Sequence, residues 1–145
     1  MIAPIIHASA VLVGPRAVLI RGPSGSGKSR LAFALVHTSA LPFTRLVGDD
    51  RVHIEAAHGR LLARPAGTLA GLIEIRGLGL RRLPYEPVAV VGLVMDLEAV
   101  DAERLPEPTT ATSLAGVTVP RLCAAPGADP LGMLIAALRT ADSGH

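Results

Sequence analysis

The chain has 145 residues, 14 basic and 12 acidic side chains, a formal net charge of +2, and a hydrophobic fraction of 50%. This length and composition predict one globular domain over residues 1–145 and exclude an intrinsically disordered chain. The arginines are scattered, and the aromatic residues amount to no Trp, one Tyr and two Phe. Both features argue against a nucleic-acid partner.

The N-terminus and the cysteine content indicate the compartment. No signal-peptide pattern is present, and no apolar run reaches the roughly 18 to 20 residues needed to span a bilayer. The single cysteine, Cys123, cannot form an internal disulfide and has no neighbouring base in the sequence. We therefore predict a cytoplasmic protein without a membrane partner, in which Cys123 is a small buried apolar residue.

The spacing of the hydrophobic residues predicts a chain of several strands with two helices. Gly14-Pro15 marks the turn of a first β-hairpin, His58-Gly59 marks the turn of a second, and Pro130 suits the start of a helix. One apolar run is expected to stop at Asp96. In chain order, the predicted strands cover residues 5–13, 17–21, 52–55, 60–64 and 88–95, and the predicted helices cover 28–38 and 131–139.

Residues 22–29 match the phosphate-binding loop pattern and lie between a predicted strand and a predicted helix. The glycines allow successive N–H groups to surround an anion, Lys28 places a charge against terminal phosphates, and the Ser29 hydroxyl suits Mg²⁺. A plain glycine-rich turn is the alternative, which the flanking elements disfavour. The predicted loop consists of Gly22, Pro23, Ser24, Gly25, Ser26, Gly27, Lys28 and Ser29.

An acidic pair, Asp49 and Asp50, follows Gly48 at the end of a short apolar segment. Nucleotide-binding α/β proteins place catalytic or metal-binding carboxylates at such strand ends. Adjacent residues on an extended chain point to opposite sides, so we expect one of the two to face the terminal phosphate. A solvent-exposed acidic turn is the alternative interpretation.

Three further residues are candidates by type. His7, on the first predicted strand, could orient an acceptor, although its spacing alone favours a structural histidine. Glu74 and Arg76 are expected to share one face of an extended segment, beside Gly77 and Gly79, which would permit close backbone approach. A metal and phosphate site and a surface ion pair explain Glu74 and Arg76 equally well.

Together these segments resemble the catalytic domain of HPr kinase/phosphorylase, a bacterial enzyme that phosphorylates a seryl residue of the phosphocarrier protein HPr. His7 stands ahead of the loop, as the catalytic histidine of that family does. Leu46-Val-Gly-Asp-Asp50 and Glu74-Ile-Arg-Gly-Leu-Gly79 look like two family motifs. Leu93-Val-Met-Asp-Leu-Glu98, followed by Arg104-Leu105, is similar to a later strand and its functional arginine. The resemblance covers roughly residues 6–105.

The resemblance implies an α/β nucleotide-binding domain of the HPr kinase and PEP carboxykinase-like type, with a mixed central sheet and flanking helices. It further implies ATP and Mg²⁺ as cofactors, an HPr-like phosphocarrier as partner, and a hexamer. Asp50 would be the base for the seryl hydroxyl, with His7 assisting and Asp49 close to the metal. The remaining implied roles are phosphate contact for Lys28, Mg²⁺ binding for Ser29 and Glu74, and charge stabilisation for Arg76 and Arg104.

Two departures from the longer members of the family are visible. The chain begins shortly before His7, which resembles the short alphaproteobacterial form and predicts that an N-terminal regulatory domain is missing. Residues 125–131 read Ala-Pro-Gly-Ala-Asp-Pro-Leu, where longer members carry an arginine-bearing Pro-Gly-Arg segment associated with dephosphorylation. Reverse phosphorolysis is therefore less well supported than the kinase reaction.

The sequence thus predicts a protein serine kinase. A nucleotide-sensing regulatory module without efficient transfer is the alternative, suggested by the small size and the missing C-terminal arginine. Asp49, Asp50 and Glu74 favour the kinase over that alternative. A small-metabolite kinase is a weaker third interpretation, because no segment clearly provides both a lid and an acceptor pocket.

Overall fold

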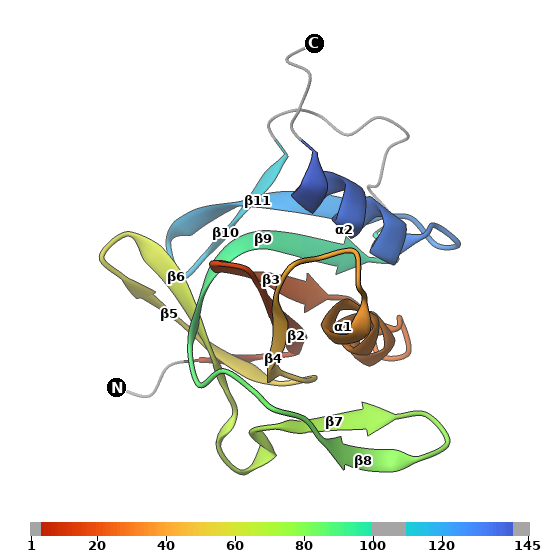
Figure 1. Cartoon of the computed structure of the whole chain (residues 1–145). Coiled ribbons are helices and arrows are strands. Elements are labelled where there is room, and N and C mark those ends of the chain that lie inside the picture. Colours follow the sequence, from red (N-terminus) through yellow and green to blue (C-terminus); the bar gives the residue numbers. More distant parts are fainter. Residues whose placement is uncertain (1–3, 100–109, 141–145) are drawn as a thin grey trace.

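The computed structural model describes residues 4–99 and 110–140 and has an α/β fold, with a curled mixed sheet and flanking helices (Figure 1). The predicted fold class is confirmed. Within the described ranges, no helix combines the length and apolarity that crossing a membrane requires. In chain order the elements are β1 (Ile5–Ile6), β2 (Ala8–Val13), β3 (Arg16–Arg21), α1 (Lys28–His37), β4 (Thr44–Gly48), β5 (Val52–Ala57), β6 (Arg60–Pro65), the short 3₁₀ helix η1 (Gly67–Leu69), β7 (Leu72–Ile75), β8 (Gly79–Arg82), β9 (Ala89–Leu97), β10 (Ala111–Leu114), β11 (Val117–Ala124) and α2 (Pro130–Arg139).

The long strand β9 lies at the centre of the large sheet. Its beginning pairs antiparallel with β6, and its later part pairs parallel with both β3 and β11. The strand order is β1-β5-β6-β9-β3-β2-β4, and β10 pairs with the outer side of β11. Because β3, β9 and β11 are parallel, their carboxyl ends meet at one edge of the sheet. Residues 22–29 follow β3 directly at that edge.

Both predicted hairpins are present. The turn at Gly14-Pro15 joins β2 to β3, with Val13 paired to Arg16. The turn at His58-Gly59 joins β5 to β6, and both of its residues have positive φ, at 52° and 76°. Two consecutive positive φ values define the turn whose twist matches that of paired strands. The second hairpin therefore depends on a glycine at position 59.

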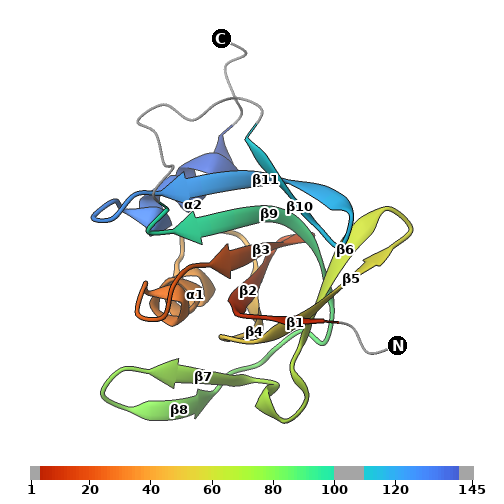
Figure 2. The same ribbon diagram turned by 180° about the vertical axis from the view of Figure 1, so that it is seen from behind.

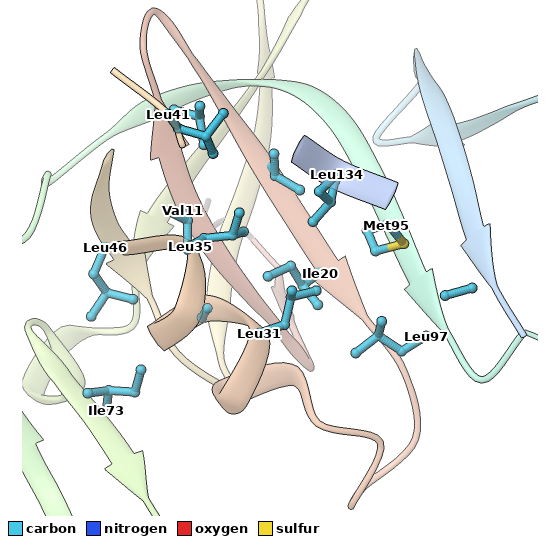
Figure 3. Packing of buried hydrophobic residues seen from close by; sticks show 14 residues of the cluster. Val11, Ile20, Leu31, Leu35, Leu41, Leu46, Ile73, Met95, Leu97 and Leu134 are labelled. Atoms are coloured by element: carbon cyan, nitrogen blue, oxygen red, sulfur yellow. The ribbon is translucent and has the colours of Figure 1, made fainter. Parts of the chain in front are cut away.

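Apolar side chains cover both faces of the central strands. One cluster lies between the sheet and the helices, where Leu31 and Leu35 of α1 and Leu134 of α2 meet Ile20 and Met95 (Figure 3). A second cluster, which includes Ala17 and Leu19 of β3, lies on the opposite face of the central strands. A strand buried on both faces reads as a continuous apolar run rather than an alternating one. This explains the unbroken Ala17-Val-Leu-Ile20 run before the loop.

Helix α1 connects the core to the loop. Its buried residues are Lys28, Leu31, Ala32 and Leu35, which recur at the spacing of one helical face. Lys28 is thus the first residue of the stripe that packs on the sheet. In both ribbon views α1 lies between α2 on one side and the β7–β8 hairpin on the other (Figures 1 and 2). The position of the lysine is therefore set by core packing.

Two strand predictions require correction. The first strand is not continuous over residues 5–13, because His7 forms a bend where the chain changes partners from β5 to β3 and β4. The second concerns residues 72–80, which were expected to be one extended segment. They form β7, a turn and β8, a separate two-stranded sheet.

The expected stop at Asp96 is also wrong, because β9 continues to Leu97. The charge is tolerated inside the strand because two arginines from the neighbouring strands bind it. Arg21 Nε and Nη2 donate to the two carboxylate oxygens of Asp96 at 2.7 and 2.8 Å, and Arg121 Nε donates to Oδ2. These contacts join the carboxyl-terminal parts of β3, β9 and β11.

Asp96→Asn is expected to destabilise the fold by about 2 kcal/mol at pH 7, because two part-buried arginines lose their carboxylate. Burial alone would raise the pKa of Asp96, but the hydrogen bonds and charges of Arg21 and Arg121 outweigh burial and lower it. The carboxylate therefore stabilises the fold at neutral pH. Its contribution is lost as the pH falls below the unfolded value of about 3.9. Urea unfolding at pH 7 and pH 3 should show the difference between the two proteins shrinking in acid.

The matched control is Glu55→Gln. Glu55 pairs with Arg64 at 3.0 Å, but the two side chains are 42% and 46% exposed. Exposed pairs contribute less than about 1 kcal/mol. An equal loss in the two variants would show that Asp96 has no special stabilising role.

Candidate active site

Three glycines shape the loop between β3 and α1, for two different reasons. Gly25 and Gly27 have φ values of 83° and 98°, in the left-handed region that favours glycine. Gly22 is needed for space, since a Cβ there would lie 3.1 Å from the Cβ atoms of Leu97 and Ser26 and 2.5 Å from Ser26 Oγ. That oxygen is itself buried and has no hydrogen-bond partner in the part of the chain that the structure describes. The loop thus has the close-packed backbone of an anion cradle.

The start of α1 is open to an anion. Gly27 is the N-cap residue, and no side chain caps the helix. Lys28 is only 7% exposed, and its Nζ donates to the carbonyl oxygens of Gly22 and Pro23 at 3.0 and 3.3 Å. The ammonium group therefore lies against the backbone of the loop at residues 22–29. Uncapped N–H groups and this cation together favour bound phosphate.

Asp49 is the centre of the hydrogen bonding beside the loop. It is 8% exposed, and its carboxylate accepts from Ser29 Oγ at 2.7 and 2.9 Å. Ser9 Oγ donates to Oδ1 at 2.8 Å, and the backbone N–H of Glu74 donates to Oδ2 at 3.2 Å. The carboxylate is thus held in place from β2, α1 and β7 at once. The partners of this side chain are 20 to 40 positions away from Asp49 in the sequence.

Asp50 lies in a different environment. Its side chain is exposed, and no hydrogen bond or ion pair of its carboxylate occurs among the described residues. Its φ is 62°, so the chain turns sharply after Gly48. The expectation that the two aspartates diverge by strand alternation is therefore corrected. They diverge because β4 ends at Gly48 and Asp50 adopts a left-handed backbone conformation.

Ser9 links the two aspartates. Its hydroxyl donates to Asp49, and the same oxygen accepts the backbone N–H of Asp50 at 3.1 Å. Ser9 is fully buried on β2. The sequence reasoning missed this residue. The available signal was a lone hydroxyl in an otherwise apolar strand, Ala8-Ser-Ala-Val-Leu-Val13, since buried polar groups require partners.

His7 lies next to Asp50 through the backbone. The residue after it, Ala8, donates its N–H to the Asp50 carbonyl at 3.0 Å. The imidazole is exposed, in the bend between β1 and β2. The bend at the strand switch thus brings this histidine to the acidic end of β4.

Glu74 and Arg76 do not share one face of a strand. Glu74 is exposed on β7, while Arg76 is exposed in the turn that follows. Gly77 and Gly79 each have a φ of 86° and open space where a Cβ would stand. Their role is therefore backbone conformation and not the close approach that was expected. Glu74 reaches the site through its backbone contact with Asp49.

Within residues 4–99 and 110–140, no group of three or more His, Cys, Asp and Glu side chains could hold a metal. A hard cation bound through phosphate, water and few protein oxygens needs no such group. The hydroxyl and carboxylate pair of Ser29 and Asp49 offers oxygen ligands of this kind. Arg104, a predicted site residue, lies outside the described residues.

The family model described as HPr Serine kinase C-terminal domain matches residues 2–85. HPr kinase/phosphorylase of Clostridium tetani is 34% identical over 100 residues, which are 64% of this chain and 32% of that protein. The protein of the same name from Clostridium beijerinckii is 39% identical over 75 residues, 52% of this chain and 24% of its own length. The chain thus spans about a third or less of these relatives.

A solved structure shares the fold. The structure titled as the Hpr(Ser) kinase/phosphatase from Coxiella burnetii superposes with a TM-score of 0.77, covering 94% of this chain and 88% of that one, at 21% identity. The family match includes the loop, both aspartates and Glu74. The chain therefore belongs to the HPr serine kinase C-terminal domain family.

Proposed function

We propose that the protein is an ATP- and Mg²⁺-dependent protein serine kinase that phosphorylates an HPr-like phosphocarrier. The observation that carries the proposal is the contrast between two adjacent carboxylates beside a phosphate loop. Asp49 is buried and held by Ser29, whereas Asp50 is exposed and its carboxylate has no described partner. A carboxylate close to the metal must be held in place, as Asp49 is. A base must be accessible to the acceptor, as Asp50 is. Family membership supports the same reaction class.

The loop fits the phosphates of ATP. Its glycine-shaped backbone and the uncapped start of α1 would hold the β- and γ-phosphates, and Lys28 would leave its two carbonyl contacts to bind them. Ser29 would then exchange its hydrogen bond with Asp49 for a place in the Mg²⁺ shell. Glu74 is a further candidate ligand for Mg²⁺, because its backbone N–H is hydrogen-bonded to the Asp49 carboxylate. Bound Mg²⁺ neutralises charge on the phosphates.

Asp50 would act on the acceptor. Its carboxylate takes the proton of the seryl hydroxyl as the seryl oxygen bonds to the γ-phosphorus and the bond to the ADP oxygen breaks. The residue after His7 is hydrogen-bonded to the Asp50 backbone, and His7 would assist this base. Arg76 and Arg104 would stabilise the transferring charge. Since Asp50 is exposed, an acceptor carried by another protein can reach it.

The same groups would serve the reverse reaction, with Asp50 as the acid while inorganic phosphate attacks phosphoserine and releases pyrophosphate. Ala128 stands where the longer members supply an arginine. We therefore expect the forward reaction to predominate. By family resemblance we further propose that the protein is cytoplasmic and assembles as a homo-oligomer, in the form of a hexamer.

Incubation with labelled ATP, Mg²⁺ and the phosphocarriers of the host tests the proposal. We expect phosphoserine on one carrier, identified by mass spectrometry, and its loss when EDTA removes the metal. Nucleotide binding without transfer to any carrier would instead favour the sensing module.

A further inference from the structure

Ser9 is a buried polar residue to which the proposed reaction gives no role. Among the residues that the structure describes, three polar or charged side chains are buried, and they are Ser9, Lys28 and Asp49. Lys28 and Asp49 belong to the proposed phosphate and metal site. The other residues of β2 are apolar, and an apolar side chain at position 9 would need no hydrogen-bond partners. Ser9 is therefore a candidate for a role in the site.

The hydrogen bonds of the Ser9 hydroxyl run in one direction. Its oxygen accepts the backbone N–H of Asp50 at 3.1 Å and lies 2.8 Å from Asp49 Oδ1. An N–H group cannot accept a hydrogen bond and an ionised carboxylate cannot donate one, so the single hydroxyl proton is directed at Asp49. Hydrogen bonds in such chains strengthen one another, and a charged acceptor strengthens the last of them. The Asp50 N–H is thus linked through Ser9 to the Asp49 carboxylate.

The backbone of Asp50 is held by contacts from β2. The pairing of β2 with β4 extends to Ala10 and Gly48, and single contacts replace it beyond that point. Asp50 has a φ of 62°, which residues other than glycine adopt only where their surroundings fix it. Its N–H is bound by the Ser9 hydroxyl, and its carbonyl oxygen accepts the N–H of Ala8 at 3.0 Å. Two consecutive residues of β2 therefore hold Asp50 in this conformation.

Ser9 would keep its contact with Asp49 when the site is loaded. In the structure the Asp49 carboxylate accepts from Ser29 Oγ at 2.7 and 2.9 Å. In the proposed reaction Ser29 leaves this carboxylate for Mg²⁺, which leaves the Ser9 hydroxyl and the Glu74 N–H as its described donors. Of these two donors, Ser9 is the one that also binds Asp50.

We propose that Ser9 is a positioning residue for phosphoryl transfer. Its hydroxyl ties the backbone of Asp50 to the carboxylate of Asp49 and so sets the place of the base relative to the phosphate loop. This role rests on the proposed function, because it takes Asp50 as the base. It assigns the precision of the site to a fully buried hydroxyl on β2.

Three substitutions of Ser9 test the proposal by single-turnover transfer from ATP to the phosphocarrier. Ser9→Ala removes the hydroxyl, and Ser9→Cys fills the same space with a poor hydrogen-bonding group. We expect transfer to slow by roughly 10- to 100-fold in both variants, because misplacing a reacting group by about 1 Å can cost about 100-fold. Ser9→Thr keeps the hydroxyl and should stay within about threefold of the wild-type rate. The Kd for ATP, measured without Mg²⁺, should be unchanged in all three variants, since the loop at residues 22–29 is intact.

The matched control is Thr44→Val. Thr44 is the first residue of β4, and its Oγ1 donates to the Val36 carbonyl oxygen at 2.9 Å, near the end of α1 that lies away from the loop. The substitution removes a part-buried hydroxyl hydrogen bond but changes no contact of either aspartate. It should lower the unfolding midpoint about as much as Ser9→Ala does and leave transfer at the wild-type rate.

Hydrogen exchange of the Asp50 amide tests the contact independently of activity. It is followed by NMR in the protein without nucleotide or metal, where the bond to Ser9 Oγ should protect this amide. Protection should fall by roughly tenfold in Ser9→Ala and Ser9→Cys and persist in Ser9→Thr and Thr44→Val. The amides of β3 should change no more in the Ser9 variants than in Thr44→Val, which separates a local effect from a general loss of stability.

The outcomes separate this inference from the kinase proposal. Transfer at the wild-type rate in Ser9→Ala and Ser9→Cys would overturn the positioning role, as would an equal loss of transfer in Thr44→Val. An unprotected Asp50 amide in the wild type would also overturn it, and so would slow transfer by Ser9→Thr in which that amide is protected. Wild-type protein that phosphorylates no carrier would reject the kinase, whereas the exchange rates would still decide whether Ser9 holds Asp50 in place.

Discussion

Lys28→Met is expected to weaken the binding of ATP by roughly 100-fold. Truncating a buried, hydrogen-bonded charge at a binding site costs about 2 to 5 kcal/mol, and each 1.4 kcal/mol is a factor of ten. Methionine keeps the apolar length of the side chain, and so it preserves the stripe of α1 that packs on the sheet. The loss should therefore appear in the Kd measured by calorimetry, with little change in the unfolding midpoint.

Arg60→Met is the matched control. It removes the same charge from an exposed position at the start of β6, beside Arg16 at the opposite end of β3 from the loop. Its Kd for ATP should equal that of the wild type. If Lys28→Met bound ATP as tightly as the control does, the loop would not be a nucleotide site.

Asp50→Asn is expected to reduce phosphoryl transfer by roughly 10²- to 10⁴-fold, the usual contribution of a general base. Asparagine has nearly the same shape, tolerates the left-handed φ of 62° at this position, and cannot accept the seryl proton. Because the side chain is exposed and forms no described contact, folding should be unaffected. Single-turnover transfer from labelled ATP to the phosphocarrier measures the effect.

Binding provides the internal control for Asp50→Asn. The Kd for ATP should stay within about twofold of the wild type, because the proposed phosphate ligands are untouched. Glu55→Gln, which removes an exposed carboxylate that pairs with Arg64, should retain full transfer. Transfer at the wild-type rate in Asp50→Asn would exclude this residue as the base and direct attention to His7.

The sequence predicted the parts of the site that local pattern specifies. The loop at residues 22–29 carries its glycines, lysine and serine in one short segment, and the turns at Gly14 and His58-Gly59 are equally local. Helix α2 was predicted from its apolar spacing and from Pro130 at its start. In each case neighbours in the chain determine the conformation.

The sequence predictions were wrong or incomplete where residues far away in the chain determine the local structure. Asp96 looked like the end of a strand because Arg121 and Arg21, which neutralise it, lie on other strands. Ser9 looked like an ordinary strand residue because its partners are 40 and 41 positions away. β11 was not predicted, and it contains Pro120, a residue that is uncommon inside strands. Only its pairing with β9 and β10 makes that segment extended.

The central place of β9 has a consequence for how the chain folds. The family match ends at residue 85, before β9, so that segment contains the loop and both aspartates but lacks the strand that covers one edge of β3. Ala17 pairs with Val91, a contact whose large sequence separation slows folding. During synthesis the apolar faces around β3 stay incomplete until β9 leaves the ribosome, and exposed strand edges of this kind favour aggregation. The phosphate loop is therefore translated early and becomes stable late.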